Sequence, residues 1–147
     1  MSSDDVARPR LEFAGVVAVF LGGVVGGLAR FETVQHWTPT ATFPWATLWV
    51  NTSGAFVLAV LLVLSERRLS HLRFFRPALG TGFCGSFTTF SAVVTSSDLL
   101  AAHGHVVTAA LYVVASVIAG LMAAFLGFGA ARTLAKARSI PEVDAAA

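Results

Sequence analysis

The stretch GTGFCGSFTTFSAVV, Gly80 to Val94, combines glycines, hydroxyl side chains and phenylalanines without any charge. Each of its three glycines weakens a helix, by about 1 kcal/mol relative to alanine. A break here would free carbonyl oxygens that can hold a small cation, as broken helices do in transporters. The ring edges of Phe83, Phe87 and Phe90 carry partial positive charge, which suits contact with an anion. An equally good interpretation is a kinked helix whose serines and threonines bond their own backbone.

Single polar side chains in the other apolar segments offer further hydrogen-bonding chemistry. Asn51, in TLWVNTSGAF, follows Thr47 by one helical turn. Its amide either bonds across a helix interface or donates to an anion in a water-filled path. Tyr112 and Ser116 are also one turn apart, so they share a helix face. Arg30 either snorkels to the membrane surface, caps the carbonyls at its helix end, or faces a pore.

The sequence lacks patterns typical of enzymes and proton-coupled pumps. No Asp, Glu, Lys or His lies deep in an apolar segment, where a proton-coupled pump normally carries one. His103 and His105 are a weak metal signal, because no third ligand accompanies them. Cys84, the single cysteine, is typical of a small buried apolar residue. We find no phosphate loop and no Ser/His/Asp set within one leaflet, and therefore expect no enzyme.

The composition is that of an integral membrane protein. The 147 residues are 56% hydrophobic and only 12% charged, whereas a soluble domain carries about 25% charged residues. The basic residues lie outside the apolar segments, where they set membrane orientation, so we expect no nucleic-acid partner. The length allows one compact helical domain.

Four apolar segments come close to the roughly 20 residues that cross a hydrocarbon core. These segments are Phe13–Ala29, Trp45–Leu64, Ala78–Ser97 and Val106–Ala131. We predict an all-α membrane domain over residues 12–133 with its third helix broken near the middle. Its four transmembrane helices are expected at about 12–30, 45–65, 77–98 and 105–132. Residues 1–11 and 134–147 are expected to be disordered cytoplasmic tails.

Lysine and arginine are unevenly distributed across the predicted membrane. Nine of the ten basic residues fall on the side that holds both termini, and the exception is Arg30. The positive-inside rule then predicts a multi-pass protein of the cell membrane with both termini in the cytoplasm.

The segments GGVVGGLARF, TLWVNTSGAF and GTGFCGSFTTFS, in this order, resemble the Fluc/CrcB family of fluoride channels. The resemblance covers Gly22 to about Ala130, essentially the whole membrane part. It implies an antiparallel, or inverted, dimer of four-helix subunits with two narrow pores. It also implies a structural sodium ion at the dimer centre, so the broken third helix would build an ion site between subunits.

The resemblance further implies roles for individual residues. The pore residues, which would contact fluoride, correspond to Thr47, Asn51, Phe90, Tyr112 and Ser116. The arginine that ends the first helix corresponds to Arg30, and the backbone carbonyls of Gly85 and Thr88 would hold the sodium ion.

Two positions depart from the family pattern. The second pore phenylalanine falls at Val93, which lacks an electropositive ring edge, and Ser86 stands where a glycine is more usual. An antiparallel homodimer needs a subunit that inserts in both directions, hence a weak charge bias. The strong bias of this chain leads to the hypothesis that it pairs with a related subunit of opposite orientation, which keeps the complete phenylalanine pair.

The resemblance implies a function in which a membrane-embedded subunit passively exports cytoplasmic fluoride and lowers its toxicity. Two alternatives stay open at this point. One is a non-conducting partner subunit of a heterodimeric fluoride channel, which Val93 favours. The other is a small four-helix multidrug exporter, which should carry a carboxylate within its first helix, whereas Glu12 lies only at the edge of that helix.

Overall fold

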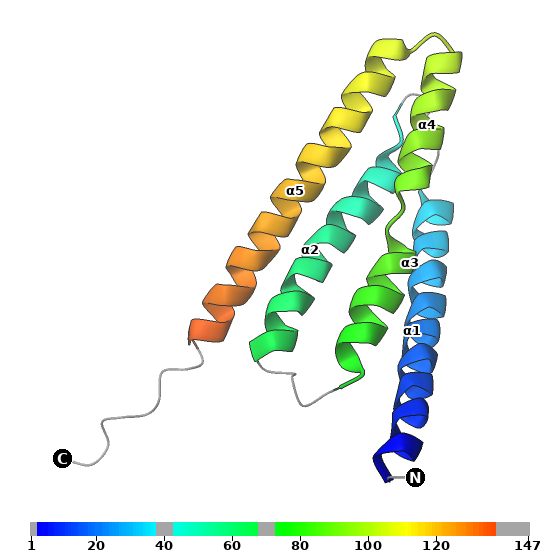
Figure 1. Ribbon diagram of the computed structural model, residues 1–147. Coiled ribbons are helices and arrows are strands. Elements are labelled where there is room, and N and C mark those ends of the chain that lie inside the picture. Colours follow the sequence, from blue (N-terminus) through cyan, green and yellow to red (C-terminus); the bar gives the residue numbers. More distant parts are fainter. Residues whose placement is uncertain (1–2, 38–42, 68–72, 138–147) are drawn as a thin grey trace, which may run out of the picture.

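The computed structural model describes residues 3–37, 43–67 and 73–137 (Figure 1). Its elements are α1 (Ser3–His36), α2 (Trp45–Arg67), the π-helical segment η1 (Pro77–Cys84), α3 (Gly85–Phe87), α4 (Phe90–Ala102) and α5 (Val106–Ala137). Every element among the described residues is helical, as the sequence predicts. Helix extends into both expected tails, since α1 begins at Ser3 and α5 ends at Ala137. Residues 1–2 and 138–147 lie outside the described part.

Three of the helices are long and apolar enough to cross a membrane. Their apolar parts are Phe13–His36, Trp45–Glu66 and Val106–Lys136. They match the first, second and fourth predicted spans. The third predicted span is divided among η1, α3 and α4. The longest of these pieces is α4, which has 13 residues. None of the three pieces reaches the roughly 20 residues of a spanning helix by itself.

Glycines bring α1 and η1 into direct backbone contact. A methyl group added at Gly22 would overlap the carbonyl oxygen of Ala78, and one added at Gly26 would overlap the carbonyl oxygen of Phe83. Glycines four residues apart form a smooth stripe on one helix face, which permits this close approach. The GGVVGG segment therefore fixes α1 against the first half of the divided span.

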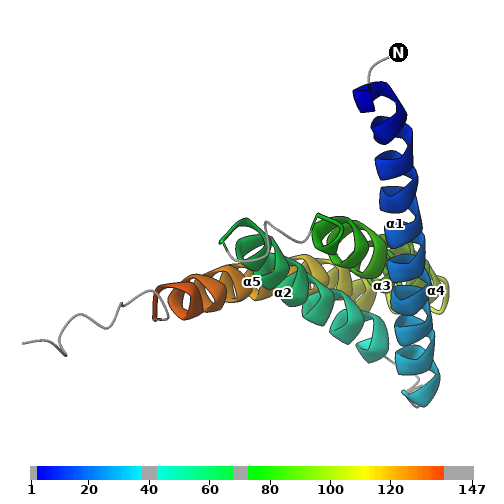
Figure 2. The ribbon, with the colours of Figure 1, turned by 90° about the horizontal axis from the view of Figure 1, so that it is seen from below.

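The helices α2 and α5 form a second pair. Gly127 of α5 lies so close to α2 that an added methyl carbon would be 2.6 Å from the Phe56 carbonyl oxygen. Seen from below, α2 and α5 lie together while α1 runs off at the other side of the molecule, next to η1 and α3 (Figure 2). The short α4 packs on α5.

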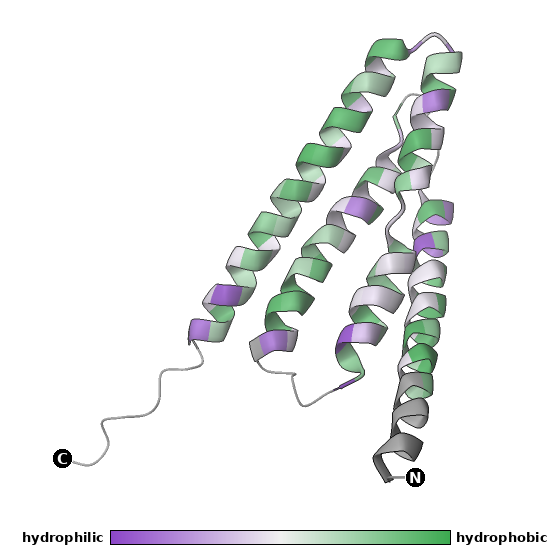
Figure 3. Ribbon diagram, viewed as in Figure 1, coloured by the Kyte–Doolittle hydropathy of each residue, from purple (hydrophilic) through white to green (hydrophobic). Residues whose placement is uncertain are grey.

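Few side chains of the described residues are buried. The largest fully buried ones are Tyr112, Val50, Val93 and Cys84. Apolar residues cover the outer faces of the long helices, and polar residues concentrate toward helix ends (Figure 3). Such outward apolar faces are what a chain needs when hydrocarbon or another subunit surrounds it.

Candidate functional site

The helical backbone is interrupted between α3 and α4. Thr88 has φ −80° and ψ 154°, and Thr89 has φ −151° and ψ 119°, so both residues are extended. The backbone N–H and the hydroxyl of Thr88 both donate to the Cys84 carbonyl, at 3.0 and 2.9 Å. These two bonds close the last turn of α3 and let the chain leave the helix.

The side-chain amide of Asn51 holds the extended segment. Its Nδ2 donates to the Thr89 carbonyl at 2.9 Å, and the Thr89 N–H donates to its Oδ1 at 2.8 Å. Asn51 thus pairs with Thr89 as a neighbouring backbone strand would, which supplies polar partners to backbone at membrane depth. The second N–H of Nδ2 remains as a donor beyond this pair.

The same interruption frees two backbone carbonyls. In a continuous helix the Thr89 N–H would donate to the Gly85 carbonyl, and the Ala92 N–H to the Thr88 carbonyl. Instead the Thr89 N–H donates to Asn51, and the Ala92 N–H donates to Thr89 Oγ1 at 3.2 Å. The N–H groups that would bond the Gly85 and Thr88 carbonyls in a helix therefore donate to side-chain oxygens instead.

The position of α2 beside the break depends on Gly54. A methyl group at this position would overlap the Thr88 Cγ2 and lie 3.2 Å from the Phe87 ring. The Phe87 ring in turn stacks on Phe83 with a centroid distance of 5.5 Å. The absence of a side chain at Gly54 lets α2 bring Asn51 within hydrogen-bond reach of Thr89.

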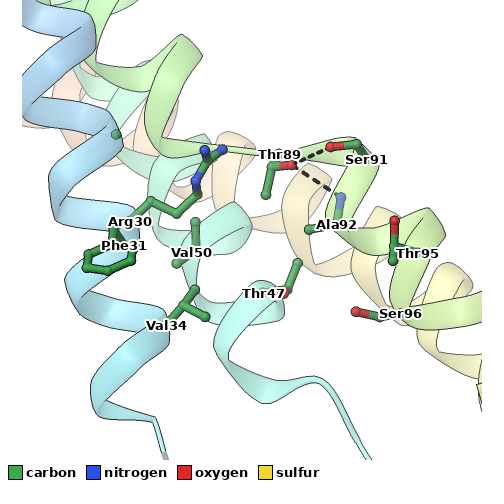
Figure 4. A pocket seen from close by; sticks show the side chains of 11 residues that line it. Arg30, Phe31, Val34, Thr47, Val50, Thr89, Ser91, Ala92, Thr95 and Ser96 are labelled. Carbon is green, nitrogen blue, oxygen red and sulfur yellow. Dashed lines mark hydrogen bonds between the residues drawn. The ribbon is translucent and has the colours of Figure 1, made fainter. Parts of the chain in front are cut away.

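An open cleft of about 650 Å³ lies between α1, α2 and α4. Its lining residues are Gly27, Arg30, Phe31, Val34, Thr47, Val50, Thr89, Ser91, Ala92, Thr95 and Ser96. Figure 4 shows the Arg30 side chain extending from α1 toward Thr89, with Ser91, Thr95 and Ser96 on the facing helix. One guanidinium and several hydroxyl groups thus face a common space, an arrangement that suits an anion.

A buried hydroxyl pair lies beyond the cleft, on α5. Tyr112 is fully buried, with 0% exposure. Neither its hydroxyl nor that of Ser116 makes a hydrogen bond of good geometry among the described residues, although the Ser116, Thr47 and Ser96 hydroxyls lie beside the Tyr112 hydroxyl. The hydroxyls of Thr47 and Ser96 are further polar neighbours of Tyr112, and the Phe43 ring meets its ring edge-on at 5.3 Å. Buried hydroxyls without partners are costly, by about 1–3 kcal/mol each.

Thr47 and Ser96 link the two polar features, because both line the cleft and both lie beside Tyr112. The structure therefore brings four of the expected site residues into one connected region. These four are Arg30, Thr47, Tyr112 and Ser116. Asn51 lies next to this region but uses its amide on Thr89.

Phe90 and Gly85 lie outside this region. The Phe90 side chain is 69% exposed and begins α4 on the outer surface of the chain. Gly85 is exposed as well. Val93 has the opposite placement, since it is 2% exposed and lies in the interior.

Sequence reasoning missed Ser96 and the pairing of Thr89 with Asn51. A signal for Thr89 existed, because threonine before an apolar helical run is typical of an N-cap. Thr89 does cap α4, with its hydroxyl accepting from the Ala92 N–H. Nothing in the sequence marked Ser96 among its neighbours Thr95 and Ser97, since only packing decides which of these hydroxyls faces Tyr112.

Within the described residues no three His, Cys, Asp or Glu side chains are close enough to hold a metal ion together. The carbonyls of Gly85 and Thr88, released from helical hydrogen bonds, are ligands of the required kind for a hard monovalent cation.

The chain matches the family model described as CrcB-like protein, Camphor Resistance (CrcB), over residues 17–128. It is 46% identical over 134 residues to a protein of Streptomyces avermitilis named fluoride-specific ion channel FluC 3, covering 90% of this chain and 65% of that one. It is 41% identical to fluoride-specific ion channel FluC 2 of Nocardia farcinica, covering 84% of this chain and 89% of the relative. A third relative, FluC 1 of Streptomyces coelicolor, is 42% identical over 84% of this chain and 80% of its own length.

Proposed function

Because the chain belongs to the CrcB-like family, whose curated relatives are named fluoride-specific ion channels, we propose that it is a subunit of a fluoride channel. The proposal agrees with three apolar helices long enough to cross a membrane. The relatives are channels rather than enzymes, in line with the missing catalytic pattern.

The buried hydroxyl pair is the observation that carries the proposal. Fluoride is small and strongly hydrated, so a pore must replace its water with hydrogen-bond donors. Tyr112 and Ser116 offer two hydroxyls that make no hydrogen bond of good geometry among the described residues. A fluoride ion passing between α2, α4 and α5 would accept hydrogen bonds from them and offset the cost of burying them.

The open cleft supplies the entrance to this path. Arg30 attracts an anion into the cleft, and the hydroxyls of Thr89, Ser91 and Thr95 replace part of its hydration shell. Thr47 and Ser96 then pass the anion to Tyr112. No described carboxylate lines the cleft, so the path carries no fixed negative charge that would repel fluoride.

The outward position of Phe90 supports a pore completed by a second subunit. Its ring is 69% exposed, and its electropositive edge is able to contact an anion without a fixed cation. In an inverted dimer this ring would reach the path of the neighbouring subunit. The strong charge bias favours a related partner that inserts in the opposite direction.

Sodium at the dimer centre is the second part of the proposal. The Gly85 and Thr88 carbonyls would hold it, because Thr89 and Ala92 donate elsewhere. A bound cation supplies positive charge that fixes two subunits against each other. Two carbonyls from one chain are few for a hard cation, so a second copy of the site from the partner would complete the shell.

The proposed physiological role is passive export of fluoride from the cytoplasm, with both termini on the cytoplasmic side of the cell membrane. Nine of the ten basic residues on the side of the termini support this orientation. Fluoride enters cells as the neutral acid and is trapped as the anion, so a passive exit lowers its concentration.

A non-conducting subunit is the second candidate function. It is favoured by Val93, which lies inside the subunit at 2% exposure and has no ring edge to offer an anion. In that case the chain would complete a heterodimer whose conducting path uses the partner's phenylalanines.

The test is fluoride efflux from liposomes, followed with a fluoride electrode, for the chain alone and together with a related subunit. Asn51→Asp should abolish at least 90% of the flux, about a tenfold loss, because a second carboxylate oxygen would face the Thr89 carbonyl in place of the amide donor. Ser53→Ala, two residues along α2, is the matched control, because that hydroxyl bonds its own helix at Trp49. Unchanged flux in Asn51→Asp would contradict the idea that the pairing of Asn51 with Thr89 is needed for a conducting path. Absence of flux from correctly assembled wild-type dimers would favour the non-conducting subunit.

A further inference from the structure

One buried hydroxyl lies outside both the cleft and the hydroxyl pair on α5. The Thr52 side chain follows Asn51 on α2, and its hydroxyl oxygen is buried without a hydrogen bond of good geometry among the described residues. Within the same part of the chain, the hydroxyls of Tyr112 and Ser116 are the other two buried side-chain groups in this state. Because a buried hydroxyl without a hydrogen bond is costly, each of the three calls for an explanation.

A hydroxyl within a helix usually finds a partner in its own backbone, which Thr52 does not use. It can donate to the carbonyl oxygen four residues earlier in the helix. Thr33 of α1 donates in this way to the Ala29 carbonyl at 2.7 Å. Ser53, the residue directly after Thr52, donates to the Trp49 carbonyl at 2.7 Å. The Thr52 hydroxyl is therefore available to a group outside its own helix.

Helical spacing places Thr52 on the face of α2 that meets α5. A methyl carbon at Gly127 of α5 would lie 3.1 Å from the Ala59 Cβ, so Ala59 points toward α5. Thr52 precedes Ala59 by seven residues, which is two helical turns to within about 20°. Ser116 precedes Gly127 by eleven residues, which is three turns to within about 20°. Thr52 and Ser116 therefore lie on the two faces that α2 and α5 turn toward each other.

The helices α2 and α5 run in the same direction, so positions along them can be compared (Figure 1). Thr47 lies beside Tyr112 near the start of both helices. Phe56 lies beside Gly127 further along both. Thr52 falls between these two levels, about 7.5 Å beyond Thr47 along the helix axis. It is the next hydroxyl on α2 after the one that borders the cleft.

The packing between α2 and α5 is tighter at one level than at the level before it. A methyl carbon at Gly127 would lie 2.6 Å from the Phe56 carbonyl oxygen. At Gly120, which is seven residues earlier on the same helix face, no atom lies within 4 Å of such a carbon. The part of the interface that follows Ser116 is therefore not closed by backbone contact.

We infer that Thr52 is a further hydrogen-bond donor on the fluoride path, which takes the ion after Ser116 and leads it on between α2 and α5. The inference rests on the proposed function, because it extends the path that begins at the cleft and passes Thr47 and Tyr112. A passing fluoride ion gives the Thr52 hydroxyl the acceptor that the chain does not supply. Threonine is uncharged, so it offers a donor without a fixed charge that would hold the ion in place.

Fluoride efflux from liposomes tests the inference, with full-length protein and with a related subunit where efflux requires one. Thr52→Val replaces the hydroxyl with a methyl group of similar size. We expect its efflux to fall about fivefold, as the loss of one hydrogen bond predicts. Its melting temperature in detergent should equal or exceed that of wild-type protein, because no hydrogen bond within the chain is lost.

Two further variants separate donation from packing. Thr52→Ser keeps the hydroxyl and should retain most of the wild-type efflux. Thr33→Val is the matched control and should leave efflux unchanged, since the Thr33 hydroxyl bonds its own helix.

The outcomes distinguish this inference from the proposed function. Full efflux in Thr52→Val, beside an active wild-type channel, would overturn the inference and leave the proposed function intact. A lower melting temperature in Thr52→Val, together with equally low efflux in Thr52→Ser, would also overturn it, because the residue would then serve packing. Absence of efflux from correctly assembled wild-type dimers would overturn the fluoride path itself, and the role of Thr52 with it.

Discussion

At the scale of single residues, one buried polar side chain is used to build the fold, whereas another makes no well-formed hydrogen bond within it. The Asn51 amide satisfies both polar groups of Thr89, and so builds the break. The Tyr112 hydroxyl makes no hydrogen bond of good geometry among the described residues, although three other hydroxyls lie beside it. A buried group whose hydrogen bond is missing weakens the fold unless a ligand supplies the partner. Substitution of Tyr112 should therefore change the stability of the fold and the fluoride flux in opposite directions.

Tyr112→Phe removes the buried hydroxyl and keeps the ring. Because the unpartnered hydroxyl costs about 1–3 kcal/mol, the variant should have a higher melting temperature in detergent than wild-type protein. Its fluoride efflux should fall several-fold, since one donor on the path is lost. Ser97→Ala is the control, because the Ser97 hydroxyl bonds the Val93 carbonyl. A destabilised Tyr112→Phe protein with full flux would mean that the hydroxyl is structural.

At the scale of elements, glycine decides where two helices may touch. The glycines of α1 fall into two classes that the sequence GGVVGG does not distinguish. A methyl group at Gly26 would overlap the Phe83 carbonyl, whereas at Gly27 nothing lies within 4 Å. The first faces η1 and the second faces the open cleft, because adjacent helical residues point about 100° apart.

Gly26→Ala and Gly27→Ala form a matched pair. Gly26→Ala should destabilise the protein by about 1–3 kcal/mol, the usual cost of overpacking. Gly27→Ala should be neutral or stabilise the helix by up to about 1 kcal/mol. Thermal unfolding in detergent measures both variants. Equal melting temperatures would show that α1 does not pack on η1 through its backbone.

Ser86 stands where the family pattern more often has a glycine, and it lies next to Gly23 of α1. A methyl carbon at Gly23 would lie 3.1 Å from the Ser86 hydroxyl oxygen, which is tight. Gly23→Ala should therefore lower stability by about 1 kcal/mol, and Ser86→Gly in the same chain should restore it. Comparing the melting temperatures of the two single variants and the double variant gives the coupling. Additive effects would contradict a direct contact between these positions.

At the scale of the whole molecule, the chain leaves much apolar surface exposed. Its outer faces carry many exposed apolar side chains, including Phe90 on α4. At the break, Gly85 is exposed and Thr88 is half-buried. In the dimer that we propose, a second subunit facing the break would cover both features, and the charge bias predicts how this chain inserts.

Orientation is measurable with single cysteines, since Cys84 is buried at 1% exposure. In intact cells a membrane-impermeant maleimide should label Ala102→Cys, at the end of α4, and should label Ser139→Cys only after permeabilisation. The expected result is a single orientation, because Lys and Arg lie almost entirely on one side. Partial labelling of both sites in intact cells would mean dual insertion, which favours a homodimer over the proposed pairing with a related subunit.

The sequence alone determined the membrane class, the apolar spans and the segment in which a helix would be difficult to maintain. These depend on composition and local pattern, which need no knowledge of neighbours. It also identified Asn51, Thr47, Tyr112 and Ser116 as polar side chains within apolar helices, because such groups are rare there. The sequence did not predict which residues of different spans are in contact.

The tertiary structure decided what those residues contact. It put the Asn51 amide on Thr89, separated Gly26 from Gly27, and turned Phe90 outward while burying Val93. It also brought Ser96 to Tyr112, which no spacing in the chain marks. The physical reason is that a hydroxyl or amide has the same local pattern whether it meets backbone, another hydroxyl or an ion path. Only the packing of α2 against α4 and α5 selects among these contacts.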